Sequence, residues 1–209
     1  MSPRVTVIDY GIGNIHSVLK ALRHQGAEVT LATAPDAIAG ADRLVLPGVG
    51  AFGDGMRALT ARAQLDAIRE YVLLSRPLLG ICLGMQLLLA ESEEFGHHRG
   101  LGLIEGSVRA IENRPTVKVP QIGWNRIVPP PGGSWDGTLL EPLPSGTMMY
   151  FVHSFTAAPT HETDRLADAD YGGQRISAAV QRGNVIGCQF HPEKSGSAGL
   201  RVIDRFLTI

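Results

Sequence analysis

The chain has few cysteines and almost no net charge, and each shortage excludes a class of protein. Its 209 residues include only two cysteines, Cys82 and Cys188, too few for a disulfide scaffold or for a structural zinc site built on thiolates. It carries 19 lysines and arginines against 20 aspartates and glutamates, a formal net charge of −1. Because nucleic-acid-binding domains of this size are normally basic, we expect no nucleic-acid partner.

Long apolar runs are also missing. The short stretch at residues 5–8 is followed at once by Asp9, far short of the core of a signal peptide. The run at residues 77–90 is interrupted by Gln86 and by two glycines, whereas a bilayer span needs about 18 or more residues with few breaks. We therefore expect no membrane contact and a cytoplasmic chain, in whose reducing surroundings a lone thiol can act as a nucleophile.

What the sequence does contain is an alternation of apolar runs and helical patterns. Strands are predicted at residues 5–8, 29–32, 44–46 and 78–81, and helices at residues 14–25, 65–74 and 83–91. Asn14 is the predicted N-cap of the first helix, and Gly26 its stop. Strands that are apolar on both faces and separated by helices indicate a parallel sheet with helices on both sides.

After residue 106 the pattern changes to closely spaced strands. We predict strands at residues 107–111, 117–122, 150–155, 176–181 and 185–190, in an antiparallel or mixed arrangement. The remaining segments are predicted as a loop at 129–137, a polar surface connection at 160–170, and a closing helix at 198–207 with Ser197 as its N-cap. Because neither connection is long enough for a domain linker, we expect one α/β domain over residues 1–209.

The segment Gly80-Ile81-Cys82-Leu83-Gly84 places a cysteine between two glycines, directly after a predicted strand and before a predicted helix. A nucleophile on such a sharp turn needs small neighbours, because larger side chains would collide with the backbone. The start of the helix also offers the Leu83 amide to an oxyanion. Taken alone, the motif fits a buried cysteine in a glycine-rich turn equally well.

A second candidate element is His191-Pro192-Glu193, at the end of the predicted strand 185–190. In an extended chain, residues two apart point to the same side, so Glu193 is predicted beside His191. A thiol needs a base, and an imidazole needs an acceptor that fixes its tautomer. We therefore predict Cys82, His191 and Glu193 as nucleophile, base and orienter. His-Pro-Glu by itself fits a surface turn, and its combination with the cysteine turn favours catalysis.

A third element is Leu46-Pro47-Gly48-Val49-Gly50, which follows the third predicted strand. Glycines allow backbone dihedrals, or a peptide flip, that direct N–H groups at an oxyanion. A simple strand-to-helix turn explains the same residues as well as an oxyanion hole does.

Other motifs are weaker. Residues 11–13 begin like a dinucleotide-binding loop, but His16 stands where the third glycine is needed. The adjacent His97 and His98 lack the spaced ligands of a zinc site. Cys188 lies inside an apolar strand and is predicted in the core. We therefore expect no metal and no cofactor.

At these residues the chain resembles the class I glutamine amidotransferases, and more closely the family of glutaminase subunits of imidazole glycerol phosphate synthase. The motifs that carry the resemblance are Asp9-Tyr10-Gly11-Ile12-Gly13-Asn14, Pro47-Gly48-Val49-Gly50, Gly80-Ile81-Cys82-Leu83-Gly84-Met85-Gln86-Leu87-Leu88, Glu91-Ser92-Glu93-Glu94, Gly123-Trp124-Asn125, Tyr150-Phe151-Val152-His153-Ser154-Phe155 and Gly187-Cys188-Gln189-Phe190-His191-Pro192-Glu193-Lys194-Ser195. The resemblance implies one flavodoxin-like α/β domain, with a mostly parallel central sheet between helices and extra antiparallel strands in the second half.

The same resemblance implies a role for each candidate residue. Cys82 would attack the side-chain amide of glutamine, His191 would protonate the departing ammonia and then activate water, and Glu193 would orient His191. A glutamyl thioester would be the intermediate. The Val49 and Leu83 amides would form the oxyanion hole, the former after a possible backbone flip. The residues implied to hold the amino-acid end of glutamine are Gly50, Gln86, Glu94, His153, Ser154 and Phe155.

A partner is implied as well. Subunits of this family pass ammonia to a (β/α)₈ cyclase subunit, with which this chain would form a heterodimer. The cyclase consumes ammonia and a ribulosyl intermediate of histidine biosynthesis, and yields imidazole glycerol phosphate and an aminoimidazole carboxamide ribotide. The residues implied near that interface are Asn14, Trp124 and Tyr150. One departure is Phe155, where tyrosine is common in the family.

Three rival interpretations stay open on sequence. A glutaminase subunit for pyridoxal phosphate synthesis would share the triad, but it usually shows a Gly-Gly-Glu-Ser run in place of residues 47–50. A cysteine hydrolase on a similar fold would have no need of Gln86 and Glu94 beside the nucleophile. A catalytically silent domain of the same family would not need an intact triad.

Overall fold

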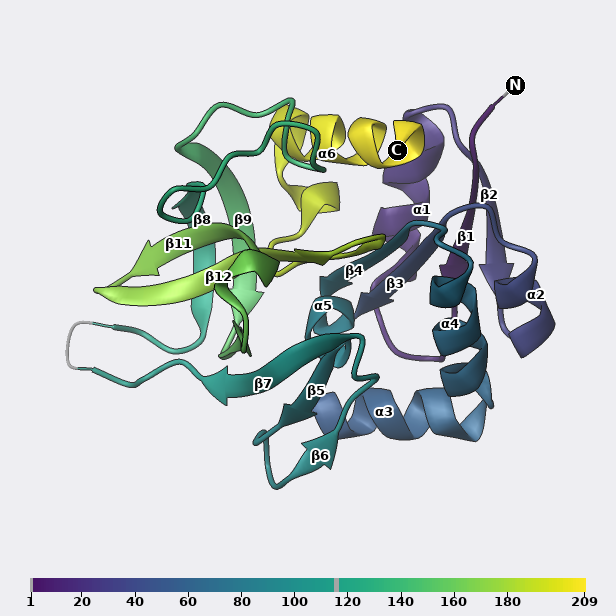
Figure 1. Cartoon of the computed structure of the whole chain (residues 1–209), viewed down its shortest axis with the longest axis horizontal. Coiled ribbons are helices and arrows are strands. Elements are labelled where there is room, and N and C mark those ends of the chain that lie inside the picture. Colours follow the sequence, from purple (N-terminus) through teal and green to yellow (C-terminus); the bar gives the residue numbers. More distant parts are fainter. Residues whose placement is uncertain (1, 115–116) are drawn as a thin grey trace.

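The computed structural model describes residues 2–114 and 117–209, which form an α/β structure around a seven-stranded sheet (Figure 1). The strand order is β11, β12, β13, β4, β3, β1, β2. The parallel strands are β1 (Arg4–Ile8), β2 (Glu28–Ala32), β3 (Leu44–Gly48), β4 (Leu78–Cys82) and β13 (Val185–Cys188). The sheet is extended antiparallel by β12 (Gln174–Arg182) and β11 (Arg165–Tyr171). The predicted parallel sheet with antiparallel additions is confirmed.

Helices cover both faces of this sheet. One face carries α1 (Ile15–His24) and α6 (Gly196–Thr208), and the other carries α2 (Pro35–Ala39), α3 (Phe52–Ala61), α4 (Gln64–Leu73) and α5 (Leu83–Leu87). Successive strand residues point to opposite faces, so Val45 packs in one apolar cluster while Leu44 and Leu46 pack in the other. Because both of its faces are covered, the centre of the sheet is buried at every position of β3 and β4, whereas the edge strand β2 is mostly exposed.

Two smaller sheets are formed by strands that follow α5. A four-stranded sheet has the order β10 (Phe155–Pro159), β7 (Ile104–Ala110), β5 (Leu89–Ser92), β6 (His98–Arg99). A two-stranded antiparallel sheet is formed by β8 (Gln121–Ile127) and β9 (Thr147–His153). The predicted strand 150–155 is thus divided at Ser154, and its two parts belong to different sheets. This division brings β9 and β10 together at one side of the cavity described below.

The predicted helix 83–91 is wrong in its second half. α5 ends at Leu87, and Leu89 begins β5, which pairs with Ile104 of β7. The run from Met85 to Leu89 is buried on all sides, so it lacks the one-sided apolar stripe that distinguishes a helix from a strand. Leu89 and the residues after it form a strand because they pair with β7, which is not part of this run.

The predicted polar connection 160–170 is also wrong, because Arg165–Tyr171 is strand β11. Leu166, Ala167 and Ala169 of this strand are buried. One of the four acids that suggested a surface loop, Asp168, is itself buried and accepts hydrogen bonds from Arg165 Nε and from an arginine of the neighbouring strand β12. A carboxylate that is paired in this way is compatible with a buried strand.

Smaller differences concern element ends. The predicted strand 117–122 starts only at Gln121, after Pro120, which has no N–H for a ladder. The closing helix begins at Gly196, with Ser195 rather than Ser197 at the N-cap position. Asn14 precedes α1 as predicted, but its side chain makes no capping hydrogen bond to the described backbone. Helices α2 and α3 were not predicted.

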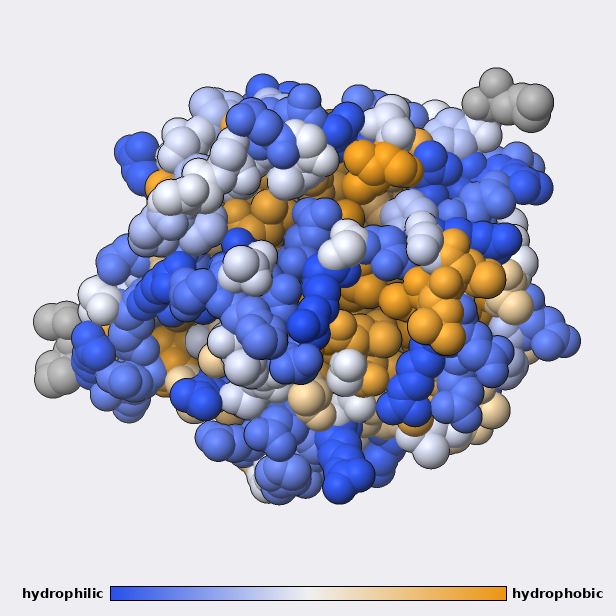
Figure 2. All heavy atoms as spheres, viewed as in Figure 1, coloured by the Kyte–Doolittle hydropathy of each residue, from blue (hydrophilic) through white to orange (hydrophobic). Residues whose placement is uncertain are grey.

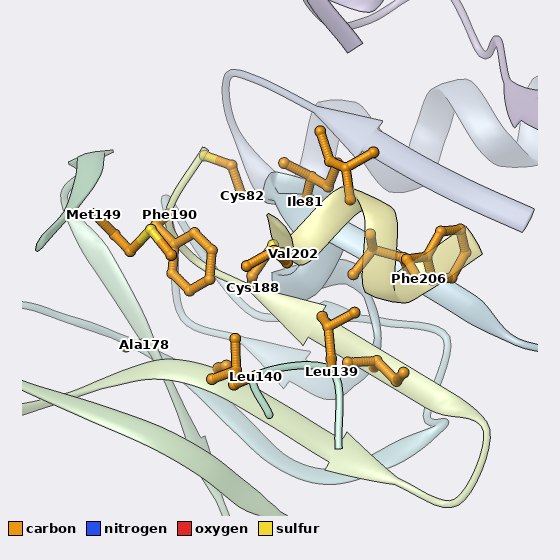
Figure 3. Packing of buried hydrophobic residues seen from close by; sticks show 14 of the residues in the cluster. Ile81, Cys82, Leu139, Leu140, Met149, Ala178, Cys188, Phe190, Val202 and Phe206 are labelled. Carbon is orange, nitrogen blue, oxygen red and sulfur yellow. The ribbon is translucent and has the colours of Figure 1, made fainter. Parts of the chain in front are cut away.

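The surface is mostly hydrophilic on the face shown in Figure 2, with apolar atoms gathered over the region of α4. Leu73 and Leu74 at the C-terminal end of α4 are exposed. In the core, Figure 3 shows Cys188 inside the cluster near Val202, and Cys82 at its edge. The predicted core position of Cys188 is confirmed. No helix of the part described here combines the length and the apolar character needed to cross a bilayer.

Candidate active site

A cavity of about 330 Å³ lies where β3 and β4 end beside His191, at the edge of the central sheet. Ligands of open α/β sheets bind at such carboxyl ends of strands. The cavity is lined by Val49, Gly50, Cys82, Leu83, Gln86, Glu94, Pro120, Val152, His153, Ser154, Phe155, His191 and Lys194. The structure therefore brings together all the predicted oxyanion and substrate residues with the predicted nucleophile and base, although they come from distant parts of the sequence.

Cys82 stands on a strained turn between β4 and α5. Its dihedrals are φ 55° and ψ −111°, a conformation that costs free energy for a residue with a Cβ. The flanking glycines make the turn possible, because a Cβ on Gly80 would lie 2.7 Å from the Met85 nitrogen, and one on Gly84 would collide with the Leu46 carbonyl oxygen. The turn leaves the thiol at the cavity wall, with 7% of the residue exposed.

His191 and Glu193 form the second part of the site. His191 Nδ1 lies 2.8 Å from Glu193 Oε1, and the Glu193 side chain is only 2% exposed. The contact agrees with the sequence analysis, but the reason given there was wrong. After His191 the chain turns into the 3₁₀ helix η2 (Pro192–Lys194), and this turn carries the carboxylate back to the ring.

The electrostatics of the pair favour a protonated imidazole. Burial disfavours the charged ring, but hydrogen bonds with Cys82 and Glu193 outweigh burial and raise the pKa of His191 to about 9. The ring is therefore mostly an imidazolium at neutral pH. A cation beside the thiol stabilises the thiolate, the form of cysteine that attacks carbonyl carbon.

The pKa of His153 is shifted in the opposite direction to that of His191. Burial is the main cause that lowers the pKa of His153 to about 4, and the nearby charge of His191 adds to it. Its Nδ1 lies 2.8 Å from the Phe155 carbonyl oxygen, and its Nε2 lies 2.9 Å from the side-chain amide of Gln121. A neutral ring has one N–H, which Nδ1 donates to the carbonyl. The Gln121 atom opposite Nε2 is Oε1, an acceptor, so the Gln121 carboxamide must be turned for its N–H to reach Nε2. His153 is thus a fixed, uncharged wall of the cavity.

Glu94 supplies negative charge at the other side of the cavity. It is 8% exposed, and its Oε2 accepts a 2.6 Å hydrogen bond from the Phe52 N–H at the start of α3. Helix N-termini stabilise carboxylates. An anchored carboxylate in a cavity suits a ligand with an ammonium group.

Phe155 enters the site through its backbone. Its carbonyl accepts hydrogen bonds from His153 and from Gln86 Nε2, the latter at 3.1 Å. Its ring packs against Phe95, with centroids 6.4 Å apart. The replacement of the tyrosine common in the family therefore leaves these backbone contacts unchanged.

The segment with Val49 and Gly50 follows β3, the strand next to β4, which ends at Cys82. Gly48, the last residue of β3, pairs in parallel register with Cys82. Gly50 has φ +97°, a backbone conformation that favours glycine. Tyr10 donates a 2.7 Å hydrogen bond from its hydroxyl to the Pro47 carbonyl and so fixes the peptide just before this segment. Among the described residues no cluster of side chains is arranged to hold a metal ion.

Two residues of the site were missed by the sequence analysis. Gln189 is wholly buried and contacts both Cys82 and Gln86, and Tyr10 holds Pro47. Gln189 did carry a signal, because it is a polar residue in the otherwise apolar run before His191. A buried carboxamide needs partners, and those partners could only be named once the strands were placed.

The residues predicted near a partner lie outside the cavity lining. Asn14 is exposed, and Trp124 on β8 is 52% exposed. The Trp124 ring packs edge to face on Tyr150 of β9, with centroids 5.9 Å apart. Trp124 and Tyr150 belong to the β8–β9 sheet. Farther along β9 in the same sheet, Val152 lines the cavity.

Comparisons with known proteins agree with this geometry. The family model described as "Glutamine amidotransferase class-I" matches residues 6–209. A chain named imidazole glycerol phosphate synthase subunit HisH 1, from Legionella pneumophila (strain Lens), is 48% identical over 210 residues, covering 98% of this chain and 99% of that one. The HisH subunit of Symbiobacterium thermophilum is 47% identical over 200 residues, covering 96% and 91%.

Solved structures show the same fold at lower identity. The structure of PurLQS from Thermotoga maritima matches with a TM-score of 0.76 and 22% identity, covering 100% of this chain and 99% of that one. A crystal structure of a glutamine amidotransferase matches with a TM-score of 0.73 and 19% identity, covering 98% and 99%.

Proposed function

The chain belongs to the class I glutamine amidotransferases and, within them, to the HisH subunits of imidazole glycerol phosphate synthase, and we propose from this a mechanism and a partner for it. It is a glutamine amidotransferase of histidine biosynthesis. One observation carries the mechanism. Cys82, on its strained turn, and His191, bonded to Glu193, line the same cavity.

The reaction begins with thioester formation. The Cys82 thiolate attacks the side-chain carboxamide carbon of glutamine, and the oxygen takes up negative charge as the carbon becomes tetrahedral. The N–H groups of Val49 and Leu83 bind this oxyanion. The carbon–nitrogen bond then breaks, and the His191 imidazolium gives its proton to the departing nitrogen, which leaves as ammonia. A γ-glutamyl thioester remains on Cys82.

Hydrolysis returns the enzyme to its starting state. Neutral His191 takes a proton from water, and the resulting hydroxide oxygen attacks the thioester carbon. The sulfur–carbon bond breaks, glutamate leaves, and the thiolate and imidazolium are restored. Glu193 keeps His191 Nδ1 protonated and the ring oriented throughout, as the third member of a triad does.

Substrate recognition is divided between charged and neutral groups. Glu94 binds the α-ammonium of glutamine, since it is the anchored carboxylate of the cavity. Neutral His153 and the backbone of Ser154 and Phe155 form the opposite wall. Gly50 and Gln86 also lie at the amino-acid end. None of the three rival interpretations weighed on sequence is supported by the relatives reported, which are named as HisH subunits.

The partner is a cyclase subunit of (β/α)₈ form, and it docks on an apolar strip beside the cavity. We define the docking strip as Ile122, Trp124, Met148, Tyr150 and Val152, which share one face of the β8–β9 sheet. Ile122, Trp124 and Met148 are 61%, 52% and 40% exposed. Exposed apolar patches of this kind mark protein interfaces. Because Val152 also lines the cavity, ammonia released there can pass into a partner rather than into water. The exposed Asn14 lies at the rim of the proposed heterodimer interface.

We also propose a cytoplasmic location. Cys82 and Cys188 are both free thiols, and reducing surroundings such as the cytoplasm keep thiols in this state.

A reconstitution tests the function. The purified chain is mixed with the cyclase subunit of the same organism, and glutamate release and imidazole glycerol phosphate formation are measured. We expect slow glutamine hydrolysis by the chain alone, because the glycines on either side of Val49 allow its N–H to turn away from the oxyanion. We expect the cyclase with its nucleotide ligand to stimulate hydrolysis. A complex that uses ammonium salts but never glutamine would contradict the proposal.

A further inference from the structure

Gln189 is a buried glutamine whose side chain lies between two residues of the proposed site. None of its surface is exposed, and its backbone N–H bonds to the Ala178 carbonyl of β12 at 2.9 Å. Its Oε1 lies 3.0 Å from Gln86 Nε2, and its Nε2 lies 3.8 Å from Cys82 Sγ. The backbone bond fixes the position of Gln189, and the side-chain contacts link the nucleophile to a substrate-binding residue.

The Phe155 carbonyl decides how the two carboxamides are turned. The oxygen and nitrogen of a carboxamide have the same shape, so their orientation follows from their partners. A backbone carbonyl only accepts, and that of Phe155 lies 3.1 Å from the Gln86 amide, so the Gln86 nitrogen must face it. The same nitrogen gives its second hydrogen to Gln189 Oε1. This turns the nitrogen of Gln189 toward Cys82.

The orientation of the two carboxamides determines which hydrogen-bonding atom Gln86 presents to a ligand and which one Gln189 presents to Cys82. Gln86 has committed both of its N–H groups within the described chain, so its carbonyl oxygen is left to meet a ligand in the cavity. That oxygen suits an N–H of the substrate and repels a carboxylate. Gln189 presents an N–H to Cys82, and a donor to sulfur favours the thiolate over the thiol.

We infer that Gln189 is a further catalytic residue, whose N–H holds the Cys82 thiolate and whose carbonyl holds Gln86 with its acceptor toward the substrate. The role in turnover rests on the proposed function, whereas the contact with Cys82 stands on geometry alone. No bond to Gln189 forms or breaks. It keeps negative charge on sulfur until attack and keeps the recognition group in place.

The test compares two substitutions in a Cys188→Ala background, where Cys82 is the single thiol. Gln189→Met keeps the size and removes both hydrogen-bonding groups, while Gln189→Glu keeps an acceptor for Gln86 and removes the N–H. The rate of Cys82 alkylation by iodoacetamide is followed from pH 5 to pH 10. Because a hydrogen bond to a charged group contributes about 1.5 kcal/mol, we expect the Gln189→Met profile to move about one pH unit upward. The Gln189→Glu profile should move at least as far, because its carboxylate also repels the thiolate.

The glutamine KM separates the two roles of Gln189. We expect about a tenfold rise in KM for Gln189→Met, because Gln86 is free to turn, and little change for Gln189→Glu. The matched control is Gln181→Met on β12, where the lost hydrogen bond is to the Gly183 carbonyl, away from the cavity. It should leave the alkylation profile and KM unchanged.

Circular dichroism and thermal unfolding establish that each variant is folded. An unshifted alkylation profile in the folded Gln189 variants overturns the inference, even if their Tm falls, because a purely structural glutamine would lower Tm without moving the profile. Alkylation uses neither glutamine nor partner. A shifted profile in a chain that never hydrolyses glutamine would therefore support the contact with Cys82 and refute the proposed function instead.

Discussion

At the scale of single residues, the two cysteines are separated by their surroundings. Cys82 lies at the cavity beside His191, whereas Cys188 is wholly buried and donates its S–H to the Gly80 carbonyl at 3.7 Å. Burial, together with the negative charges of Glu193 and Cys82, raises the pKa of the Cys188 thiol. Cys188 therefore stays a thiol at physiological pH and serves packing.

Substitution of each cysteine distinguishes these roles. In the complex, Cys82→Ala should abolish glutamine-dependent synthesis while ammonium-dependent synthesis by the cyclase survives, because only ammonia production needs the thiolate. Cys188→Ala should change glutamine hydrolysis little and lower the free energy of unfolding by about 1 kcal/mol through the lost sulfur contacts. Steady-state assays with glutamine and with ammonium chloride measure both effects. Equal loss of glutamine use in the two variants contradicts the assignment.

At the scale of elements, the end of β1 is connected to the end of β3 by one hydroxyl. Tyr10, 2% exposed, donates to the Pro47 carbonyl, and the next peptide carries the Val49 N–H. A Cβ on Gly48 would collide with this same hydroxyl. The contact places the oxyanion segment opposite Cys82 and connects it to the Gly11–Asn14 loop at the proposed partner rim.

Tyr10→Phe removes this hydroxyl. We expect kcat for glutamine hydrolysis in the complex to fall about tenfold with KM unchanged, less than the 10² to 10³ expected for losing an oxyanion donor outright. The matched control is Tyr71→Phe, whose buried hydroxyl bonds to the Pro77 carbonyl at 2.9 Å, far from the cavity lining. Both variants should lose about 1 kcal/mol of stability. A similar fall in kcat for Tyr71→Phe would show that the effect is general loosening.

The β8–β9 sheet gives a second prediction at this scale. Trp124→Ala removes the largest exposed side chain of the docking strip and should raise the Kd for the cyclase at least tenfold, because aromatic anchors dominate interfaces. Leu73→Ala is the control, since Leu73 is 82% exposed at the end of α4, outside the strip. Titration calorimetry with the purified cyclase compares them. Weakening by Leu73→Ala, with Trp124→Ala neutral, would move the interface to α4.

At the scale of the whole molecule, two histidines make stability depend on pH in opposite directions. The pKa of His153 is lowered to about 4, so its contribution is complete above its ordinary value of 6.5 and is lost as pH falls toward 4. The pKa of His191 is raised to about 9, so its contribution is complete below 6.5 and is lost as pH rises through 9. These two groups together favour a stability maximum near pH 6.5.

Urea unfolding at pH 4 to 9 measures this dependence. We expect the free energy of unfolding to fall by about 3 kcal/mol between pH 6.5 and pH 4 on account of His153, since one pKa unit corresponds to about 1.4 kcal/mol. His153→Gln keeps a polar side chain that does not titrate, so the acid limb should become shallower. An acid limb of the same slope in both proteins would exclude His153 as its cause.

The local pattern of residues determined the parallel half of the fold and predicted the residues of the proposed triad. β-branched runs between helical stretches predicted β1 to β4, and small residues around Cys82 predicted the sharp turn, because backbone sterics act between near neighbours. His191 and Glu193 were predicted together because residues two apart in an extended chain point to the same side, but η2 and not an extended strand joins them.

Only the tertiary structure decided what depends on contacts between distant segments. The run after Cys82 became α5 and then β5 because β7 pairs with it, and β11 became a buried strand because arginines pair with Asp168. The roles of Tyr10 and Gln189 were likewise out of reach of the sequence, since a hydroxyl or a carboxamide acquires its function from the group it meets. Here those groups, Pro47 and Cys82, stand 37 and 107 positions away along the chain.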